Sequence, residues 1–129
     1  MKPVFSNITL YVSNVWFTVE WYRKVFGLVP TLLNPAGHDN QLHAEGMQLV
    51  IVAAAQAQLL IPRFQSNSFL FDPPGLHLTF ATVDVEALYQ AALAHGGVGV
   101  AEPAPNENGL LQAGLRDING VLISLVTKP

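Results

Sequence analysis

His77 is the residue of this chain best suited to chemistry, and it lies in the alternating segment His77-Leu78-Thr79-Phe80. An imidazole can hydrogen-bond or act as a general base near neutral pH, and it can also bind a metal ion. In an extended strand Thr79 shares a face with His77, so two polar side chains line one side. His77 is therefore the single catalytic candidate; the competing interpretation is a histidine that only satisfies a neighbour.

Arg116 and Tyr11 are the next ligand-binding candidates. Arg116 stands directly before the turn at residues 117–120 (DING). Its guanidinium could recognise a carboxylate, or it could pair with an acid such as Asp117. Tyr11 could stack on a planar ligand and donate its hydroxyl, although tyrosine is also favoured in strands for its own sake.

Aromatic residues form two further groups. The first crowds the start of a predicted helix, and we interpret it as core packing, with a dimer contact or a cavity rim as the alternative. The second lies in a proline-containing stretch, where aromatics either anchor the segment or cover a ligand. The groups are Trp16, Phe17 and Trp21, and Phe64, Phe69 and Phe71.

These residues need strands and helices to position them. Alternating apolar residues and β-branched content predict strands near residues 5–12, 29–33, 41–45, 47–53, 76–82, 98–102, 110–116 and 121–127. A helix is predicted after the first strand of each half, because apolar residues recur there at helical spacing. The apolar stripes are Val15, Val19, Tyr22 and Phe26, and Val85, Leu88, Ala92 and His95.

Capping residues are expected to bound both helices, and they reveal a repeat. The expected N-caps are Asn14 (or Ser13) and Asp84, and the expected ends are Gly27 and Gly96-Gly97. A shift of 70 positions superimposes Asn7 on His77, Asn14 on Asp84 and Gly27 on Gly97. We interpret the two halves as copies of one β-α-β-β-β module.

One face of each sheet must pack on a helix, since an amphipathic helix has to bury its apolar stripe. The other face is then free to line a small-molecule pocket. The residues expected on the free faces are Asn7, Thr9, Tyr11, Gln48, Val50, His77, Thr79 and Ser124. Together with Arg116, Phe69 and Phe71 they form the predicted ligand-binding site.

In order and spacing, four segments resemble the vicinal oxygen chelate (glyoxalase / bleomycin-resistance protein / dioxygenase) superfamily. They are residues 8–12 (ITLYV), 21–28 (WYRKVFGL), 75–78 (GLHL, followed by Val83-Asp84-Val85) and 116–123 (RDINGVLI). The resemblance implies an α+β fold in which two βαβββ modules form curved mixed sheets around a central cavity. It also implies one domain over residues 1–129, with modules at about 1–56 and 75–129, a connecting loop at about 57–74, and pairing as a homodimer.

Metal-dependent members of that family hold a divalent ion on their first, fourth, fifth and eighth strands. Carried over by the resemblance, these positions fall on Asn7, on or next to Val50, on His77 and on Ser124. Only His77 keeps a strong ligand, whereas a firm Zn, Fe, Mn or Ni site wants three or more donors. Gln48 or Glu45 could substitute for the missing carboxylate. We expect no metal cofactor, with a divalent ion held by an atypical ligand set as the alternative.

Composition excludes several classes of function. The chain has 129 residues, no cysteine, a net charge of −3 and six scattered basic residues. It therefore has no disulfides or thiolate ligands, and no basic cluster to bind nucleic acid. No apolar run is long enough to span a bilayer and no signal peptide is recognisable, so we expect no membrane partner and a cytoplasmic location.

Three functions remain open. The first is metal-free binding and sequestration of a small molecule, an antibiotic or aromatic metabolite, as in the bleomycin-resistance branch of the family. The second is a metal-dependent lyase, isomerase or extradiol-type dioxygenase with an atypical ligand set. The third is a non-catalytic interaction module whose cavity is filled by large side chains such as Leu122 and Tyr11.

Overall fold

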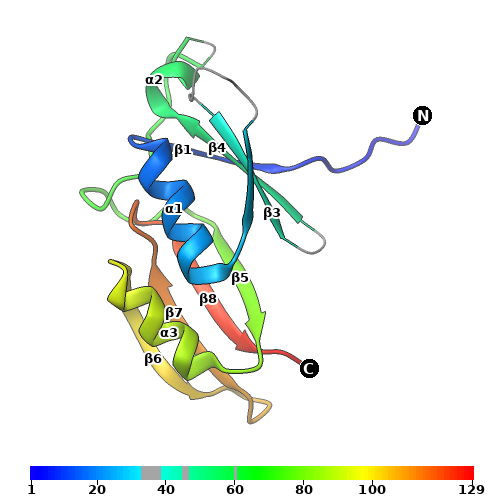
Figure 1. Cartoon of the computed structure of the whole chain (residues 1–129), viewed down its shortest axis with the longest axis vertical. Helices are drawn as coiled ribbons and strands as arrows, with labels where there is room; N and C mark the ends of the chain where they lie inside the picture. The colour runs from blue at the N-terminus through cyan, green and yellow to red at the C-terminus, as the bar shows by residue number, and fades with distance from the viewer. Residues whose placement is uncertain (33–38, 45–46, 60) are drawn as a thin grey trace. The chain divides into compact units, whose positions relative to one another are not determined.

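The computed structural model of the chain describes residues 1–32, 39–44, 47–59 and 61–129 (Figure 1). The chain divides into two compact units, Met1–Ser66 and Asn67–Pro129. The division falls inside the connecting loop expected at residues 57–74.

The first unit contains a helix, a four-stranded curved sheet and one short extra helix. Its elements are β1 (Ile8–Val12), α1 (Val15–Phe26), β2 (Val29–Leu32), β3 (Asp39–Ala44), β4 (Met47–Ala53) and α2 (Ala54–Ala57). The strand order is β1-β4-β3-β2. β1 pairs with β4 in parallel, and the other two pairs are antiparallel. Because a parallel pair needs a crossover connection, the α1 segment leads the chain from one edge of the sheet to the other.

The second unit repeats this arrangement. Its elements are β5 (His77–Thr82), α3 (Val85–Ala94), β6 (Val98–Pro105), β7 (Leu111–Arg116) and β8 (Leu122–Thr127). The strand order is β5-β8-β7-β6, with β5 and β8 parallel. The two sheets therefore share one topology, as the 70-residue repeat predicts, and the predicted α+β class with curved mixed sheets is confirmed.

The helix boundaries follow from their caps. The Asn14 side chain accepts a hydrogen bond of 2.9 Å from the Phe17 N–H, and Asp84 accepts one of 3.0 Å from the Ala87 N–H. Gly27 ends α1 in the left-handed region, at φ 69°. At the end of α3, His95 is the C-cap and Gly96 takes φ 107°. The capping predictions are thus confirmed, with Asn14 rather than Ser13 as the first N-cap.

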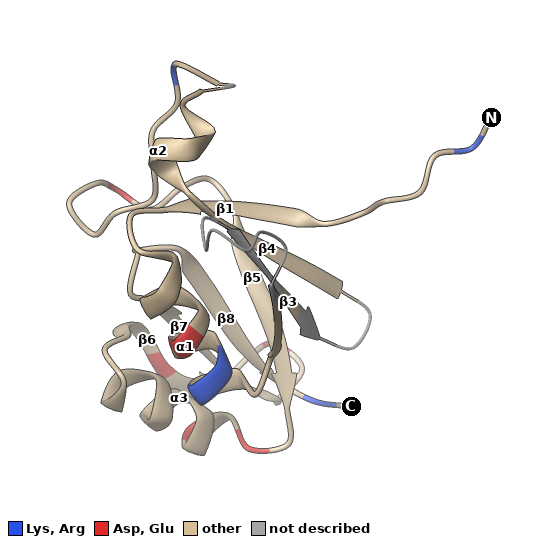
Figure 2. Ribbon diagram, turned by 45° about the horizontal axis from the view of Figure 1, so that its top comes forward, with Lys and Arg blue, Asp and Glu red and all other residues tan. Residues whose placement is uncertain are grey.

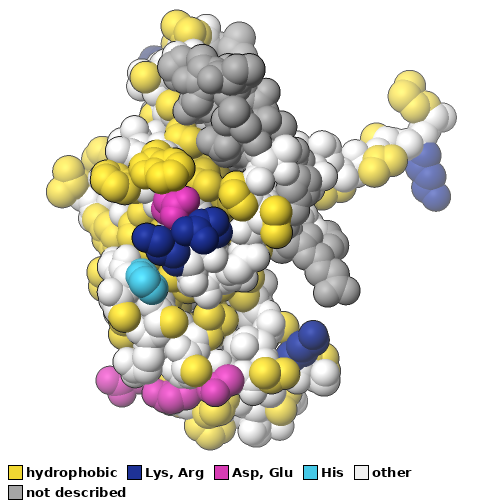
Figure 3. Space-filling model, viewed as in Figure 1, with side chains coloured by type: hydrophobic (Ala, Val, Ile, Leu, Met, Phe, Trp, Pro, Cys, Tyr) yellow, Lys and Arg dark blue, Asp and Glu magenta, His cyan; other side chains and the backbone are white. Residues whose placement is uncertain are grey.

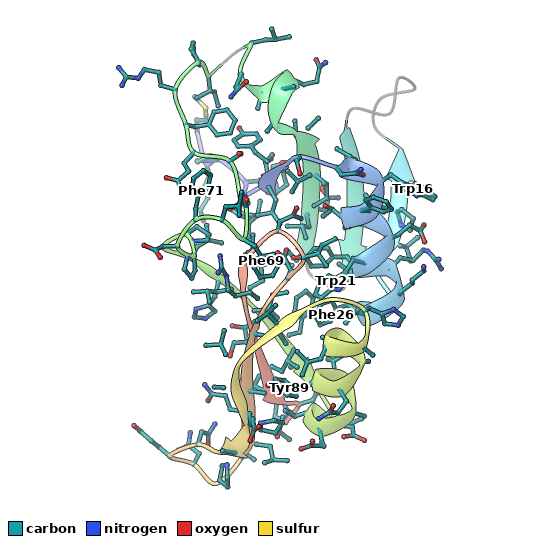
Figure 4. The ribbon with its side chains drawn as sticks, turned by 90° about the vertical axis from the view of Figure 1, so that its left-hand side faces the viewer. Trp16, Trp21, Phe26, Phe69, Phe71 and Tyr89 are labelled. Carbon is teal, nitrogen blue, oxygen red and sulfur yellow. The ribbon has the colours of Figure 1, made fainter. Side chains whose placement is uncertain are left out.

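Each sheet buries one row of side chains on the side that its helix covers. In the first unit the fully buried members include Leu49 and Ile51 of β4, and in the second Leu115, Ile123 and Leu125. The α1 core includes Trp21, whose ring lies edge-on to Tyr22 and Phe26 at 4.9 and 5.5 Å. Figure 4 shows Trp21 and Phe26 close together on this helix.

The expected core role of two aromatic residues of α1 needs correction. Trp16 and Phe17 are not core residues: they are 66% and 63% exposed. Val15, Val19 and Tyr22 belong to the buried stripe of α1, and a rotation of about 100° per residue turns Trp16 and Phe17 away from it.

Smaller differences concern the ends and contacts of other elements. In α3 the sheet-facing aromatic is Tyr89, while Leu88 is half-buried and His95 exposed. β1 begins at Ile8, β6 extends to Pro105, and α2 was not predicted. The parts of the predicted strands that reach residues 33 and 45 lie outside the described residues.

Charges are sparse over the ribbon (Figure 2), apart from the acidic and basic residues of α1. There Arg23 binds Glu20 at 2.7 Å and holds the pKa of that carboxyl below its usual value. No helix in the described part of the chain is long and apolar enough to cross a membrane.

Replacing the N-cap of α1, Asn14→Ala, should lower the free energy of unfolding by about 1 kcal/mol, because the Phe17 N–H loses its acceptor. Urea denaturation measures the change. The matched control is Ser13→Ala, which removes a polar side chain at the neighbouring exposed position and should change stability by less than about 0.5 kcal/mol. Equal losses in the two variants would contradict the assignment of Asn14 as the cap.

Candidate functional site

The first unit presents a mixed face on the side of its sheet that α1 does not cover. Thr9 and Tyr11 of β1 are Cα partners of Val50 and Val52 of β4, so the four side chains form two adjacent rows. Thr9 is exposed, and the other three are half-buried. Gln48, also half-buried, continues the β4 row. This is the face on which the sequence places the ligand contacts of the first module.

Aromatic residues make one wall of this face. The rings of Tyr11 and Phe64 lie 4.8 Å apart with an interplanar angle of 54°. Phe64 therefore anchors the segment after α2 to the sheet, which is one of the two roles expected for the loop aromatics. Tyr11 keeps a half-buried surface that a planar ligand could meet.

Asn7 lies directly before β1 and its amide is held locally. Its Nδ2 donates to the Thr9 hydroxyl at 2.9 Å, and its Oδ1 accepts from the Ser6 hydroxyl at 2.9 Å. Of the family's metal positions in this unit, Asn7 supplies a neutral amide and Val50 supplies no donor. Glu45 lies outside the described residues.

The second unit presents a corresponding face on the side of its sheet away from α3. His77, Thr79 and Ala81 of β5 are Cα partners of Leu122, Ser124 and Val126 of β8. Gln112, Gly114 and Arg116 of β7 continue the same rows. The β5 residues are exposed and the β8 residues half-buried. His77, Thr79, Ser124 and Arg116 therefore share one face, as the alternation predicts.

Five residues of this face were not predicted as ligand contacts from the sequence: Ala81, Gly114, Leu122, Val126 and Gln112. The larger side chains among them are those of Leu122, Val126 and Gln112. The first two alternate with buried Ile123 and Leu125, and Gln112 alternates with buried Ala113. That alternation was the signal that could have found them. Leu122 and Val126 make the face more apolar than the predicted polar residues suggest.

Arg116 is tied to backbone carbonyls and not to an acid. Its Nε donates to the Gly120 oxygen at 2.8 Å and its Nη2 to the Phe71 oxygen at 2.9 Å. The guanidinium carbon lies 4.9 Å from the centre of the Phe69 ring, within range of a cation–π interaction. Figure 4 shows Phe69 and Phe71 on the segment that Arg116 holds. The alternative in which Arg116 pairs with Asp117 is not what the structure shows.

Asp117 instead organises the turn that follows β7. Its side chain is fully buried, and Oδ1 accepts from the Asn119 and Val121 N–H groups at 2.8 and 2.9 Å. Gly120 takes φ 88° in this turn, and a Cβ there would collide with the Arg116 guanidinium and lie 3.0 Å from the Ser68 oxygen. Only glycine fits that position, so the turn and the Arg116 contacts depend on each other.

The side chains at the positions where metal-dependent members of the family bind an ion are poor ligands for a divalent cation. The first unit offers the Asn7 amide, and the second offers the His77 imidazole and the Ser124 hydroxyl. In the described residues no group of three or more His, Asp or Glu side chains could hold an ion. In neither unit do these neutral donors compensate the charge of a divalent cation.

The fold and these faces define a class: a paired-repeat α+β protein with two curved sheets, each carrying one helix-packed face and one mixed face. The chain belongs to the Glyoxalase/Bleomycin resistance protein/Dioxygenase superfamily, whose family model matches residues 5–125. No curated protein is detectably similar to it in sequence.

Solved structures with this fold include three informative neighbours at low sequence identity. A hypothetical protein from S. aureus is 15% identical with a TM-score of 0.83, covering 99% of this chain and 95% of that one. A glyoxalase-related enzyme from Fulvimarina pelagi is 19% identical with a TM-score of 0.82, covering 98% and 88%. TioX from Micromonospora sp. ML1 is 18% identical with a TM-score of 0.71, covering 97% and 98%. At these identities the likeness extends to the fold alone.

Asp117→Ala should lower the free energy of unfolding by about 2–4 kcal/mol, because two N–H groups of the turn lose their acceptor. Asp117→Asn keeps an acceptor oxygen and should cost less than the alanine variant. Urea denaturation compares them, with Glu107→Ala as the control for loss of an exposed carboxylate. A loss no larger than that of Glu107→Ala would contradict the structural role.

Proposed function

We propose that the protein binds and sequesters an aromatic small molecule, an antibiotic or a metabolite, without a metal ion. The observation that carries the proposal is the set of side chains at the four family metal positions, Asn7, Val50, His77 and Ser124. Three of them lack the charge or the donor that a divalent ion needs. On the mixed face of each sheet, half-buried apolar and aromatic side chains favour a planar apolar ligand; they include Tyr11 and Phe64 in the first unit and Leu122 in the second.

Family membership supports the same proposal without naming a ligand. Members of the superfamily often bind small molecules, and the solved structures with this fold include a glyoxalase-related enzyme and a glyoxalase/bleomycin resistance protein. If the protein were instead a metal-dependent enzyme with an atypical ligand set, His77 would be the expected metal ligand. The third possibility, an interaction module, requires that the mixed faces bind no small molecule at all.

The test measures metal and ligand on the same preparation. Protein purified without a tag or chelator should contain far less than one equivalent of Zn, Fe, Mn or Ni. A library of planar antibiotics and aromatic acids should contain compounds that raise the Tm, since a ligand at one hundred times its Kd stabilises by about 2.7 kcal/mol. His77→Ala is the control for metal. Stoichiometric metal that disappears in this variant would establish the metal-dependent alternative, and a library without any shift would favour the interaction module.

We also propose that the protein acts as a cytoplasmic homodimer and that the aromatic surface at the start of α1 contributes to the interface. Trp16 and Phe17 are well exposed there, an unusual place for two large aromatic rings. Figure 3 shows hydrophobic side chains over this end of the helix, next to the charged side chains of its later turns.

Replacing both aromatics, Trp16→Ser with Phe17→Ser, should convert the dimer into a monomer, because the interface loses its largest apolar side chains. Sedimentation velocity measures the mass. Val83→Ser, which removes another exposed apolar side chain (85% exposed), should remain dimeric. A monomeric unmodified protein would refute the dimer, and a dimeric double variant would place its interface elsewhere.

A further inference from the structure

One end of the second sheet brings an imidazole and a guanidinium to the same row. Leu122 of β8 is the Cα partner of His77 on one side and of Arg116 on the other. Neighbouring strands lie about 4.8 Å apart, so the Cα atoms of His77 and Arg116 are separated by about 10 Å across Leu122. Because all three residues share a face, the two nitrogen-bearing side chains flank one apolar residue.

The positive charge of Arg116 is held in place without being neutralised. Its hydrogen bonds go to the carbonyl oxygens of Gly120 and Phe71, which fix its orientation but carry no net charge. The acid beside it in sequence, Asp117, is buried and accepts hydrogen bonds within its own turn. Arg23 and Glu20 form an ion pair in the other unit. Among the described residues no acid forms such a pair with Arg116.

The surroundings of this row favour an anion and an aromatic ring together. The next row contains the Thr79 and Ser124 hydroxyls, which are Cα partners. At the face positions of β5, β8 and β7 no residue carries a carboxylate; they are His77, Thr79, Ala81, Leu122, Ser124, Val126, Gln112, Gly114 and Arg116. Beside Arg116, Phe69 is fixed over the guanidinium and Phe71 is 46% exposed.

From this geometry we propose that the second sheet binds the carboxylate of a planar aromatic acid. The guanidinium of Arg116 and an N–H of His77 hold the carboxylate oxygens above Leu122. An imidazole offers an N–H donor in either protonation state, and a guanidinium still has N–H groups beyond the two that bind carbonyls. The ring of the ligand lies on the apolar part of the face, with Phe71 at its edge. The inference rests on the proposed function and specifies the chemical class of its ligand.

The experiment compares two probes that differ only at the polar group, 2-naphthoate and its neutral counterpart 2-naphthamide. Titration calorimetry on the unmodified 129-residue chain should give a Kd for the acid at least tenfold lower than for the amide, because a charge-assisted contact replaces a neutral one. This comparison uses the unmodified protein and does not depend on the folding of any variant.

Two variants test whether the preference for the acid over the amide depends on the row formed by His77, Leu122 and Arg116. Arg116→Met should remove most of the preference for the acid, and Arg63→Met, which removes the charge of an exposed arginine outside the site, should leave it unchanged. His77→Leu should raise the Kd of 2-naphthoate several-fold, and His95→Leu is the matched control that should leave it unchanged. Circular dichroism shows whether the variants fold, which matters for Arg116→Met because Arg116 also holds the Phe71 segment.

The outcomes separate this inference from the function on which it rests. If both probes bind with equal affinity, or if Arg63→Met removes the preference as strongly as Arg116→Met, the carboxylate site is overturned while small-molecule binding stands. If neither 2-naphthoate nor 2-naphthamide binds, and the wider library also gives no thermal shift, the proposed function fails and the inference with it.

Discussion

One-sided burial of each sheet is the constraint on which the rest of the structure depends. Successive side chains of a strand point to opposite faces, so a helix that covers one face fixes which residues are left on the other. In the second unit α3 covers the side that holds Leu115, Ile123 and Leu125. A slip of one residue in the register of β8 would replace Ile123 and Leu125 on this side by Leu122, Ser124 and Val126, and would bury the β8 part of the candidate site.

Local patterns predicted the framework because the interactions that form it are themselves local. The N-caps Asn14 and Asp84 bond to residues three positions ahead, and the strand faces follow from a period of two. The repeat was also visible, since the equivalent strands, caps and helix ends recur in the same order. These features together account for the class of fold and for the eight strands and two longer helices found in the described residues.

The features that the sequence did not predict depend on the phase of a helix and on contacts with residues elsewhere in the chain. Trp16 and Phe17 were interpreted by their hydrophobicity, whereas the helical phase set by Val15 and Val19 directs them outward. α2 is a single turn without a side-chain cap, too short for a periodic pattern to reveal it. It contacts β4 and β1, so packing stabilises what local propensity would not.

The sequence predicted which residues make up the candidate site, but it did not predict which residues they contact. Alternation placed His77, Thr79 and Ser124 on one face, yet nothing local indicates that Arg116 binds the Phe71 carbonyl, 45 positions away. The same holds for the ring contact between Tyr11 and Phe64. Long-range contacts of this kind depend on where the connecting segment runs, and its proline-containing sequence is compatible with many paths.

The charge of a binding site need not follow the charge of the whole chain. A net charge of −3 spread over 129 residues would by itself suit a cationic ligand. Salt, however, screens charges in solution within about 8 Å under physiological conditions, so a ligand responds mainly to the groups beside it. At the end of β7 that group is the half-buried Arg116, whose hydrogen-bond partners are neutral. None of the face positions of β5, β8 and β7 carries an acid that would oppose it. The proposed affinity for an organic anion is therefore compatible with a chain whose net charge is negative.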